Sequence, residues 1–153
     1  MQVTARAVRD FLSTPDVLNK LYTEKKNRYF SLQERATKTT STLTGMPGGG
    51  NSDHEAVLAS LADAVDEAAK WRELSEDKRE LIHRFINEAD IDAHYKDILL
   101  RRYYLGLGWA IILGELQWDG AVCRRKMFYD HNRALEACAA WVNKTGKFKE
   151  EIA

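Results

Sequence analysis

The fold is decided by the stretch Ile98-Leu-Leu-Arg-Arg-Tyr-Tyr-Leu-Gly-Leu-Gly-Trp-Ala-Ile-Ile-Leu-Gly-Glu-Leu-Gln117, followed by Arg124-Arg-Lys-Met-Phe-Tyr-Asp-His-Asn-Arg-Ala-Leu-Glu136. Its apolar residues recur at helical spacing, and glycine-containing turns divide it into three short helices. The last helix begins with three cationic residues. Two helices that support a cationic third one are typical of a helix-turn-helix, whose last helix can enter the DNA major groove.

Composition and charge limit the class of protein. The 153 residues carry no net charge, although 30% of them are charged. The charge is segregated, with a balance of +4 in residues 1–52, −7 in residues 53–97 and +2 in residues 98–143. A protein that coats DNA with its whole surface is thereby excluded, and the basic and acidic blocks are expected to face different partners.

The apolar segments are short. The longest apolar run, Trp109 to Leu113, cannot cross a bilayer, and the N-terminus lacks the apolar core of a signal peptide. Cys123 and Cys138 both lie in helical patterns, which favours reduced thiols. We therefore expect a soluble cytoplasmic protein that binds no membrane.

A long helical hairpin is expected over residues 1–89. Its first helix runs from about Pro15 to about Thr37, with Thr14 as a plausible cap. A seam at heptad spacing follows this helix and consists of Leu18, Tyr22, Lys25, Tyr29, Leu32 and Ala36. The seam can pack on the partner helix of the same chain or form a dimeric coiled coil, and its three heptads favour packing within the chain.

A glycine-rich connector over residues 37–52 separates the two hairpin helices. It lacks the Lys-Ser/Thr pair of a phosphate-binding loop, so a flexible link is the better interpretation. Ser52 and Glu55 have the spacing of a capping box, and the second helix extends to about Ala89, with a kink or a new start at Ser75 left open. Its apolar stripe contains Val57, Leu61, Ala64, Ala68, Trp71 and Leu74.

The helix-turn-helix module is expected over residues 90–143, followed by a tail over residues 144–153. Asp90 or Asp92 can cap its first helix, and the last helix runs from about Ala121 to Asn143. No stretch predicts a strand, so the fold class is all-α. The expected core of the module consists of Tyr103, Trp109, Ile112, Leu116, Met127, Phe128, His131 and Leu135.

The last helix has two faces when its residues are placed at 100° intervals. Met127, Phe128, Ala134, Leu135 and Cys138 lie near His131 and form an apolar stripe. Arg125, Lys126, Tyr129 and Arg133 lie on the opposite face, while Arg124 points near the stripe and can reach a phosphate. Arginine can pair with guanine, lysine can neutralise phosphates, and tyrosine can contact the backbone or a thymine methyl group.

No catalytic or metal-binding pattern stands out. Glu80 and His83 have the Glu-x-x-His spacing of di-iron bundles, but those sites need two copies and further carboxylates. A histidine on an apolar face, such as His131, is more often a hydrogen-bonded core residue than a ligand. No combination of serine or cysteine with histidine marks a nucleophile. We therefore expect a protein that is not an enzyme and needs no cofactor or metal.

The stretch Leu100-Arg-Arg-Tyr-Tyr-Leu-Gly-Leu-Gly-Trp-Ala-Ile-Ile112 and the segment His131-Asn-Arg-Ala-Leu135 resemble the helix-turn-helix of region 4 of bacterial sigma factors. More closely, residues 15–140 resemble a family of small phage and prophage proteins that carry this module. The resemblance includes the loop Ser41-Thr-Leu-Thr-Gly-Met-Pro-Gly-Gly-Gly-Asn-Ser-Asp53. It implies a regulator of late transcription that binds double-stranded DNA and also contacts host RNA polymerase.

The chain departs from that family between the last two helices, where it has about four more residues. Either Trp118-Asp-Gly-Ala121 lengthens the turn, or the last helix starts one turn earlier. The first alternative places Arg124 to Lys126 at the groove-facing end, and the second places Gly120 to Cys123 there. In addition, Ala110 and Ile111 replace two positions that are usually polar, which predicts an exposed apolar patch.

Two functions follow from these patterns. The first is a phage or prophage transcription regulator that contacts DNA through Arg124, Arg125, Lys126, Tyr129 and Arg133, with the hairpin as a dimerisation or polymerase-contact arm. The alternative is a helical adaptor or inhibitor that binds a host protein through its acidic 53–97 face. Both functions leave open whether the chain forms a homodimer.

Overall fold

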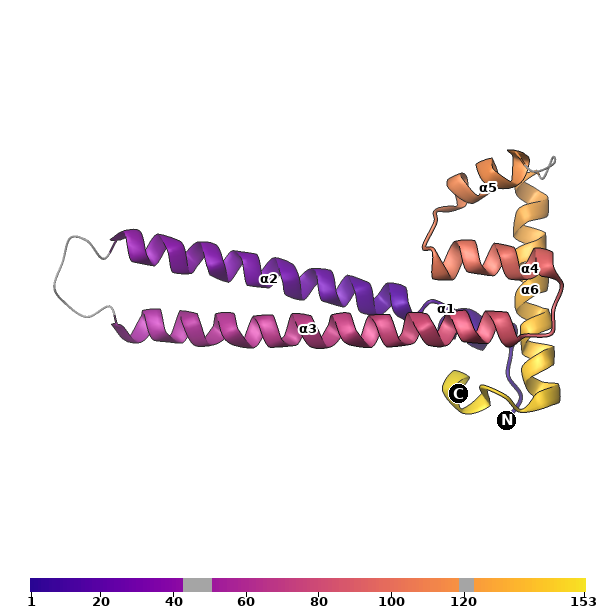
Figure 1. Cartoon of the computed structure of the whole chain (residues 1–153), viewed down its shortest axis with the longest axis horizontal. Helices are drawn as coiled ribbons and strands as arrows, with labels where there is room; N and C mark the ends of the chain where they lie inside the picture. The colour runs from indigo at the N-terminus through magenta and orange to yellow at the C-terminus, as the bar shows by residue number, and fades with distance from the viewer. Residues whose placement is uncertain (43–50, 119–122) are drawn as a thin grey trace. The chain divides into compact units, whose positions relative to one another are not determined.

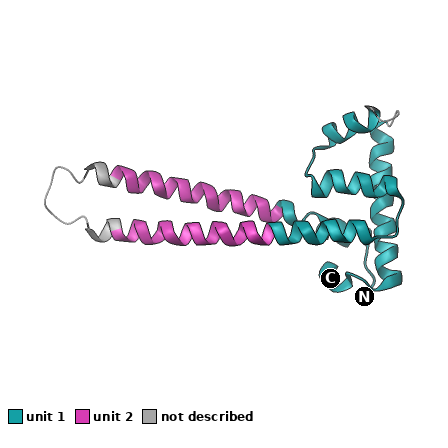
Figure 2. Cartoon of the chain, in the orientation of Figure 1, with its two compact units in different colours: residues 1–16, 76–153 teal, residues 17–75 magenta. Residues whose placement is uncertain are grey.

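The computed structural model describes residues 1–42, 51–118 and 123–153, with side chains described over residues 1–38, 55–117 and 123–153. These residues form α-helices and contain no strand, so the predicted all-α class is confirmed (Figure 1). The chain divides into two compact units, residues 1–16 with 76–153 and residues 17–75 (Figure 2). The predicted connector, residues 37–52, is too long at both ends, because α2 continues to Thr42 and α3 begins at Asn51; residues 43–50 lie outside the described part of the chain.

Unit 2, residues 17–75, consists of the paired parts of α2 (Thr14–Thr42) and α3 (Asn51–Glu88). The predicted seam of α2 is partly buried along its whole length, and the Lys25 ammonium lies 3.2 Å from the Glu67 carboxylate of α3. On α3 Ala64 is buried, whereas Leu74 is exposed at the edge of the predicted stripe. The seam thus packs within the chain.

The long helix α3 contains no break at Ser75. The helix continues through this position to Glu88, and its last turns bury Ile82, Phe85 and Ile86 in unit 1. The Ser52 side chain of the predicted capping box lies outside the described residues. The alternative of a kink or a new start, which the sequence left open, is not realised because Ser75, Glu76 and Asp77 all tolerate a helix interior at modest cost when the turns on both sides are anchored.

Unit 1 contains a helix that the sequence analysis does not predict. α1 spans Ala5–Leu12, and the Thr4 hydroxyl caps it by accepting a hydrogen bond from the Ala7 amide at 3.2 Å. Val8, Phe11 and Leu12 are buried, at the i, i+3 and i+4 positions of one face. This short helix is therefore an integral part of the core.

The predicted three-helix module is present in unit 1. It comprises α4 (Ala93–Leu99) with its continuation η1 (Leu100–Tyr104), α5 (Trp109–Trp118) and α6 (Arg124–Thr145). Gly106, at φ +67°, lies in the turn that follows η1, and Gly146, at φ +72°, ends α6 in the left-handed conformation that glycine adopts without strain. A short helix, α7 (Lys149–Ile152), occupies the expected tail.

Two clusters of apolar side chains hold unit 1 together. In the larger cluster the Phe85 ring lies 5.4 Å from that of Phe11, 5.8 Å from that of Trp141 and 5.3 Å from that of Phe148, all edge to face. The smaller cluster joins α4, α5 and α6 through buried side chains, namely Ile98, Ile112, Leu116 and Met127. Both clusters use α6, which is therefore the element common to the whole unit.

We expect Phe85→Ala to lower the free energy of unfolding by about 3–5 kcal/mol, because the substitution leaves a cavity among three aromatic rings. Urea denaturation followed by circular dichroism measures this change. Ile111→Ala is the matched control, since Ile111 is 55% exposed in the same unit. It is expected to change stability by no more than about 0.5 kcal/mol. Equal losses in the two variants would contradict the position of Phe85 at the centre of the core.

The two cysteines should differ in reactivity. Cys138 is buried in α6, and this burial raises the pKa of its thiol to about 12, whereas Cys123 precedes the helix and is exposed. An aromatic disulfide reagent at pH 8 should therefore modify one thiol per chain quickly and the second only after unfolding. The Cys123→Ser variant should lose the fast phase, and fast modification that persists in this variant would contradict the burial of Cys138.

Candidate nucleic-acid interface

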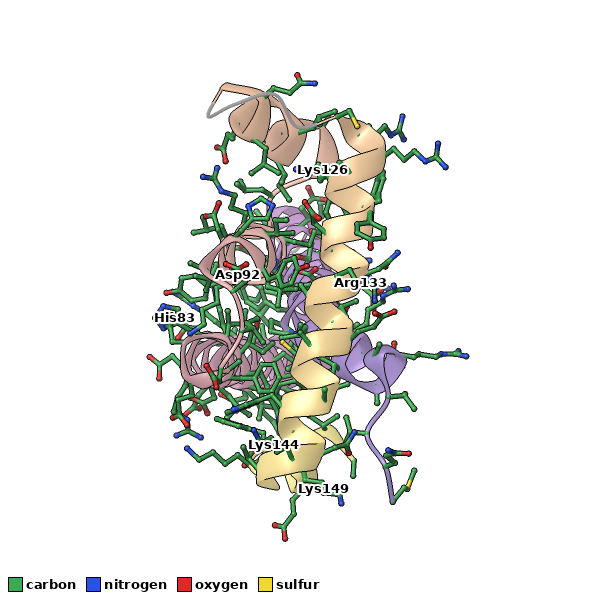
Figure 3. All side chains as sticks on the ribbon, turned by 90° about the vertical axis from the view of Figure 1, so that its right-hand side faces the viewer. His83, Asp92, Lys126, Arg133, Lys144 and Lys149 are labelled. Carbon is green, nitrogen blue, oxygen red and sulfur yellow. The ribbon has the colours of Figure 1, made fainter. Side chains whose placement is uncertain are left out.

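The long helix α6 has one buried face and one exposed face, as its sequence pattern predicts. Met127, His131 and Leu135 are buried, each with at most 5% of its surface exposed. Arg125, Lys126 and Arg133 are exposed, and so is Tyr129, at 56%. We refer to Arg125, Lys126, Tyr129 and Arg133 as the cationic face. Figure 3 shows Lys126 near the beginning of the helix and Arg133 further along it.

The predicted core of the module is also largely correct. Tyr103, Ile112, Leu116, Met127, His131 and Leu135 are buried, whereas Trp109 and Phe128 are only partly buried. The two partly buried rings lie 5.1 Å apart and pack against the smaller cluster. Their exposed edges border a cavity, which explains why their burial is incomplete.

An ion-pair network holds α5 to the preceding helix. The Arg101 guanidinium donates from Nε to both carboxylate oxygens of Asp97, at 3.0 and 3.1 Å, and from Nη1 to Glu115 of α5. This arrangement orients α5 relative to η1. Ala110 and Ile111 of α5 are exposed, as predicted for the two apolar positions of this helix.

The start of α6 decides between the two alternatives for the turn. The helix begins at Arg124, with Cys123 as its N-cap, so Arg124 to Lys126 form its first turn. Residues 119–122 of the turn lie outside the described part of the chain. The observed boundary therefore matches the first alternative, in which Arg124 to Lys126 stand at the N-terminal end of the helix.

The first turn of α6 combines three cations with the free amides of a helix N-terminus. Among the described residues the N-cap Cys123 makes no side-chain hydrogen bond to these amides, and the turn itself contains no acidic residue. The N-terminus of a helix carries a partial positive charge, and its first amides have no partner within the helix. Cationic side chains are unfavourable there unless an anion approaches, so the local sequence favours binding of a negatively charged partner.

The members of the cationic face and the neighbouring Arg124 differ in their contacts within the chain. Arg133 donates from Nε to the Tyr129 hydroxyl at 3.1 Å and from Nη1 to Glu136 at 3.0 Å. The Arg124 guanidinium lies over the Phe128 ring at 5.8 Å, near the apolar stripe as predicted. In the part of the chain that the structure describes, Arg125 and Lys126 form neither a hydrogen bond nor an ion pair. They are thus the residues most available to a partner.

A cavity of about 300 Å³ lies beside the cationic face and was not predicted from the sequence. Its lining comes from α1, the first turn of α2, η1, the start of α5 and the middle of α6, and consists of Arg9, Ser13, Asp16, Arg102, Tyr103, Trp109, Phe128, His131 and Asn132. Asn132 borders both the cavity and the cationic face on the surface of α6. The sequence signal that could have revealed the α1 wall is the apolar spacing of Val8, Phe11 and Leu12.

A buried hydrogen bond forms the inner wall of this cavity. The Tyr103 hydroxyl and His131 Nε2 lie 2.9 Å apart, and both residues are at least nine-tenths buried. Burial, followed by the positive charges of Arg9 and Arg102, lowers the pKa of His131 to about 4. Burial also raises the pKa of the Tyr103 phenol. Both groups are therefore neutral at pH 7, which confirms His131 as a hydrogen-bonded core residue.

Two other histidines of the described residues, His83 and His94, have local partners. His83 lies 3.0 Å from the Asn87 side-chain amide and stacks on the Tyr104 ring, while His94 Nε2 lies 3.0 Å from Asp130 Oδ2. The described residues contain no group of three or more His, Cys, Asp or Glu side chains placed to hold a metal ion. Among the helices of the described ranges, none has the length and apolar character needed to cross a membrane.

Comparisons with protein-family models, with curated proteins and with solved structures give no match for this chain.

The depressed pKa of His131 predicts a pH dependence of stability. Between about pH 4 and the unfolded value near 6.5, the unfolded chain binds more protons at this histidine than the folded chain does. The contribution of His131 to the free energy of unfolding is therefore fully present above about pH 6.5. It falls by up to about 3 kcal/mol as the pH is lowered toward 4.

Urea denaturation at pH 4.5 and pH 7 tests this dependence in the wild type and in His131→Gln. The glutamine can keep a hydrogen bond to Tyr103 but does not titrate, so the variant should lose much less stability on acidification. His83→Gln provides the control with an exposed histidine and should keep the wild-type dependence. The same pH dependence in all three proteins would contradict the assignment to His131.

Proposed function

We propose that this protein binds double-stranded DNA through the cationic face of α6 and regulates transcription. The observation that carries the proposal is the division of α6 into two faces. Its apolar stripe is fixed in both clusters of unit 1, so the opposite face is held in position with Arg125 and Lys126 available. A rigid support for exposed cations is what a recognition helix requires.

The supporting helices favour this function over an ordinary solvated surface. α4 with η1 packs on α6, and α5 adds Ile112 and Leu116 to the cluster that contains Met127 from the first turns of α6. The order of two supporting helices followed by a longer cationic one is typical of a helix-turn-helix. The N-terminal turn of the third helix then carries the groups that approach the major groove.

The contacts within the chain suggest distinct roles for the cationic residues. Arg125 and Lys126 are unpaired in the described residues, so they are assigned to guanine bases or phosphates. Arg133 is held by Tyr129 and Glu136, which fits a positioned phosphate contact that also orients the tyrosine. Arg124, which lies over Phe128, is assigned to a phosphate beside the first turn.

The biological setting of the proposal comes from the resemblance to phage and prophage proteins. It implies a regulator that acts in the bacterial cytoplasm and also contacts host RNA polymerase. The exposed pair Ala110 and Ile111 on α5 lies next to the proposed DNA-binding helix in the chain and offers an apolar patch for such a protein contact.

A second candidate function rests on the acidic surface of α3. Asp63, Asp66 and Glu73 are exposed, and none of them forms an ion pair in the described part of the chain. Such a surface could dock on a basic host protein, so that the chain acts as an adaptor or inhibitor. The two functions differ in the charge of the partner and in the face of the protein that it contacts.

The salt dependence of DNA binding tests the main proposal. We expect a random-sequence 30-base-pair duplex to bind at 50 mM KCl, with an affinity that falls steeply toward 200 mM. Each lost phosphate contact lowers the slope of log K against log [KCl] by about 0.9 in magnitude. Arg125→Ala and Lys126→Ala should each reduce this slope by about one, as measured by fluorescence anisotropy.

Lys144→Ala is the matched control, because Lys144 is exposed at the opposite end of the same helix. It lies 18 residues beyond Lys126, or about 27 Å along the axis, and should leave the slope unchanged. Lack of binding at 50 mM KCl would overturn the proposal. Loss of affinity in the control that equals the loss in Lys126→Ala would also overturn the assignment to the start of α6.

A further inference from the structure

Two guanidinium groups in the cavity beside α6 have no carboxylate partner. Arg9 Nη2 donates to Asn132 Oδ1 at 3.1 Å, and Arg102 Nη1 donates to the Leu107 carbonyl at 3.1 Å. Neither arginine forms an ion pair with any described residue. Asp16 also lines the cavity, so two cations face one carboxylate and the lining keeps a net positive charge.

The histidine at the inner wall is affected by this excess charge. Arg9 of α1 and Arg102 of η1 are the two charged groups that, after burial, lower the pKa of His131. Arg102 is half-buried and Arg9 is exposed, and the charge of each acts on the buried His131 ring without a carboxylate partner to offset it. An anion in the cavity would offset this charge and would raise the pKa of His131.

Aromatic rings form the rest of the wall. The Trp109 ring lies 4.7 Å from the His131 ring and 5.1 Å from the Phe128 ring, and the Arg102 guanidinium covers its face at 4.8 Å. The Tyr103 ring stacks against His131 at 5.8 Å. Apolar and aromatic walls with a few convergent polar groups are characteristic of sites for small molecules, and about 300 Å³ is at the lower end of their volumes.

The backbone beside the cavity is also unusual. η1 is a five-residue π-helix in which the Leu105 amide donates to the Leu100 carbonyl at 2.9 Å. π-helical turns are rare and occur frequently at functional sites. Here the widened turn carries both Arg102 and Tyr103, two consecutive residues that line the same cavity.

We propose that this cavity binds a small aromatic anion, with the anionic group between Arg9 and Arg102 and the planar ring against Trp109, Phe128 and Tyr103. Guanidinium groups match carboxylate and phosphate oxygens, and the aromatic wall contributes stacking and dispersion contacts to a ring. His131 and Tyr103 are buried, at 5% and 6% exposed, whereas Arg9, Asp16 and Asn132 are exposed, so the aromatic wall is reached from an open, polar side. The proposal does not depend on DNA binding by the cationic face.

Phenyl phosphate is the probe, and isothermal titration calorimetry with the full chain is the measurement. We expect phenyl phosphate to bind at least ten times more tightly than inorganic phosphate, because only the former contacts the aromatic wall. Benzoate tests a carboxylate in place of the phosphate. Binding of either phenyl phosphate or benzoate at least ten times more tightly than inorganic phosphate supports the proposal. Equal binding of inorganic phosphate and both ring-bearing anions would overturn it.

Arg9→Gln and Arg102→Gln remove the charges and keep a hydrogen-bonding side chain. Each should weaken phenyl phosphate binding at least tenfold. Arg84→Gln is the matched control, since the Arg84 guanidinium also lies over an aromatic ring, that of Phe148, but does not line this cavity. Unchanged binding in both cavity variants, or an equal loss in Arg84→Gln, would overturn the proposed site.

Nuclear magnetic resonance of the His131 ring gives an independent readout. Saturation with phenyl phosphate should raise the pKa of His131 from about 4, because the bound anion opposes the charges of Arg9 and Arg102. The free protein and the saturated protein both contain Asp16 and Tyr103, the other titratable residues that line the cavity, so the two titrations differ only in the bound anion. An unchanged His131 titration in the saturated protein would overturn the proposal.

Arg125→Ala should bind phenyl phosphate like the wild type, which separates this result from the DNA-binding proposal.

Discussion

Burial of the apolar stripe of α6 is the constraint on which the rest of unit 1 depends. One end of the stripe supplies Met127 to the smaller cluster with α4 and α5, and the other end supplies Leu135, Cys138 and Val142 to the larger cluster with α1 and α3. Neither cluster encloses a core without this helix. The same burial determines which side chains of α6 face outward, so the position of the cationic face is a consequence of packing.

The sequence predicts those elements whose residues are neighbours in the chain. The hairpin seam from Leu18 to Ala36 and the two faces of α6 follow from periodicity over many turns, where each turn adds to the same pattern. The exposed pair Ala110 and Ile111 follows instead from the resemblance, in which these two positions are usually polar. Long, strongly periodic helices bury the faces that their sequences define, so these predictions are confirmed by the observed burial.

The parts that local periodicity does not reveal are those assembled from distant segments. α1 has only eight residues, and such a short helix depends on tertiary contacts, here with α6 and α7. Because α1 was not predicted, the approach of Arg9 to Asn132 was not predicted either. The cavity lining comes from five segments of the chain, and two of its residues, Arg102 and Tyr103, lie on a π-helical turn that follows from no simple residue pattern.

Unit 1 is discontinuous in sequence, because the chain leaves it after Asp16 and returns to it at Glu76. Its two parts meet as far apart in sequence as Val3 and Asn143, where the Val3 amide donates to Asn143 Oδ1 at 2.8 Å and the Asn143 side-chain amide donates to the Val3 carbonyl at 2.8 Å. In the unfolded chain, closure of this unit carries the entropy cost of a long loop. Pairing of α2 with α3, as at Lys25 and Glu67, shortens that loop to nine residues on each side, from Asp16 to Lys25 and from Glu67 to Glu76. The inserted hairpin thereby affects the order and rate of folding of unit 1.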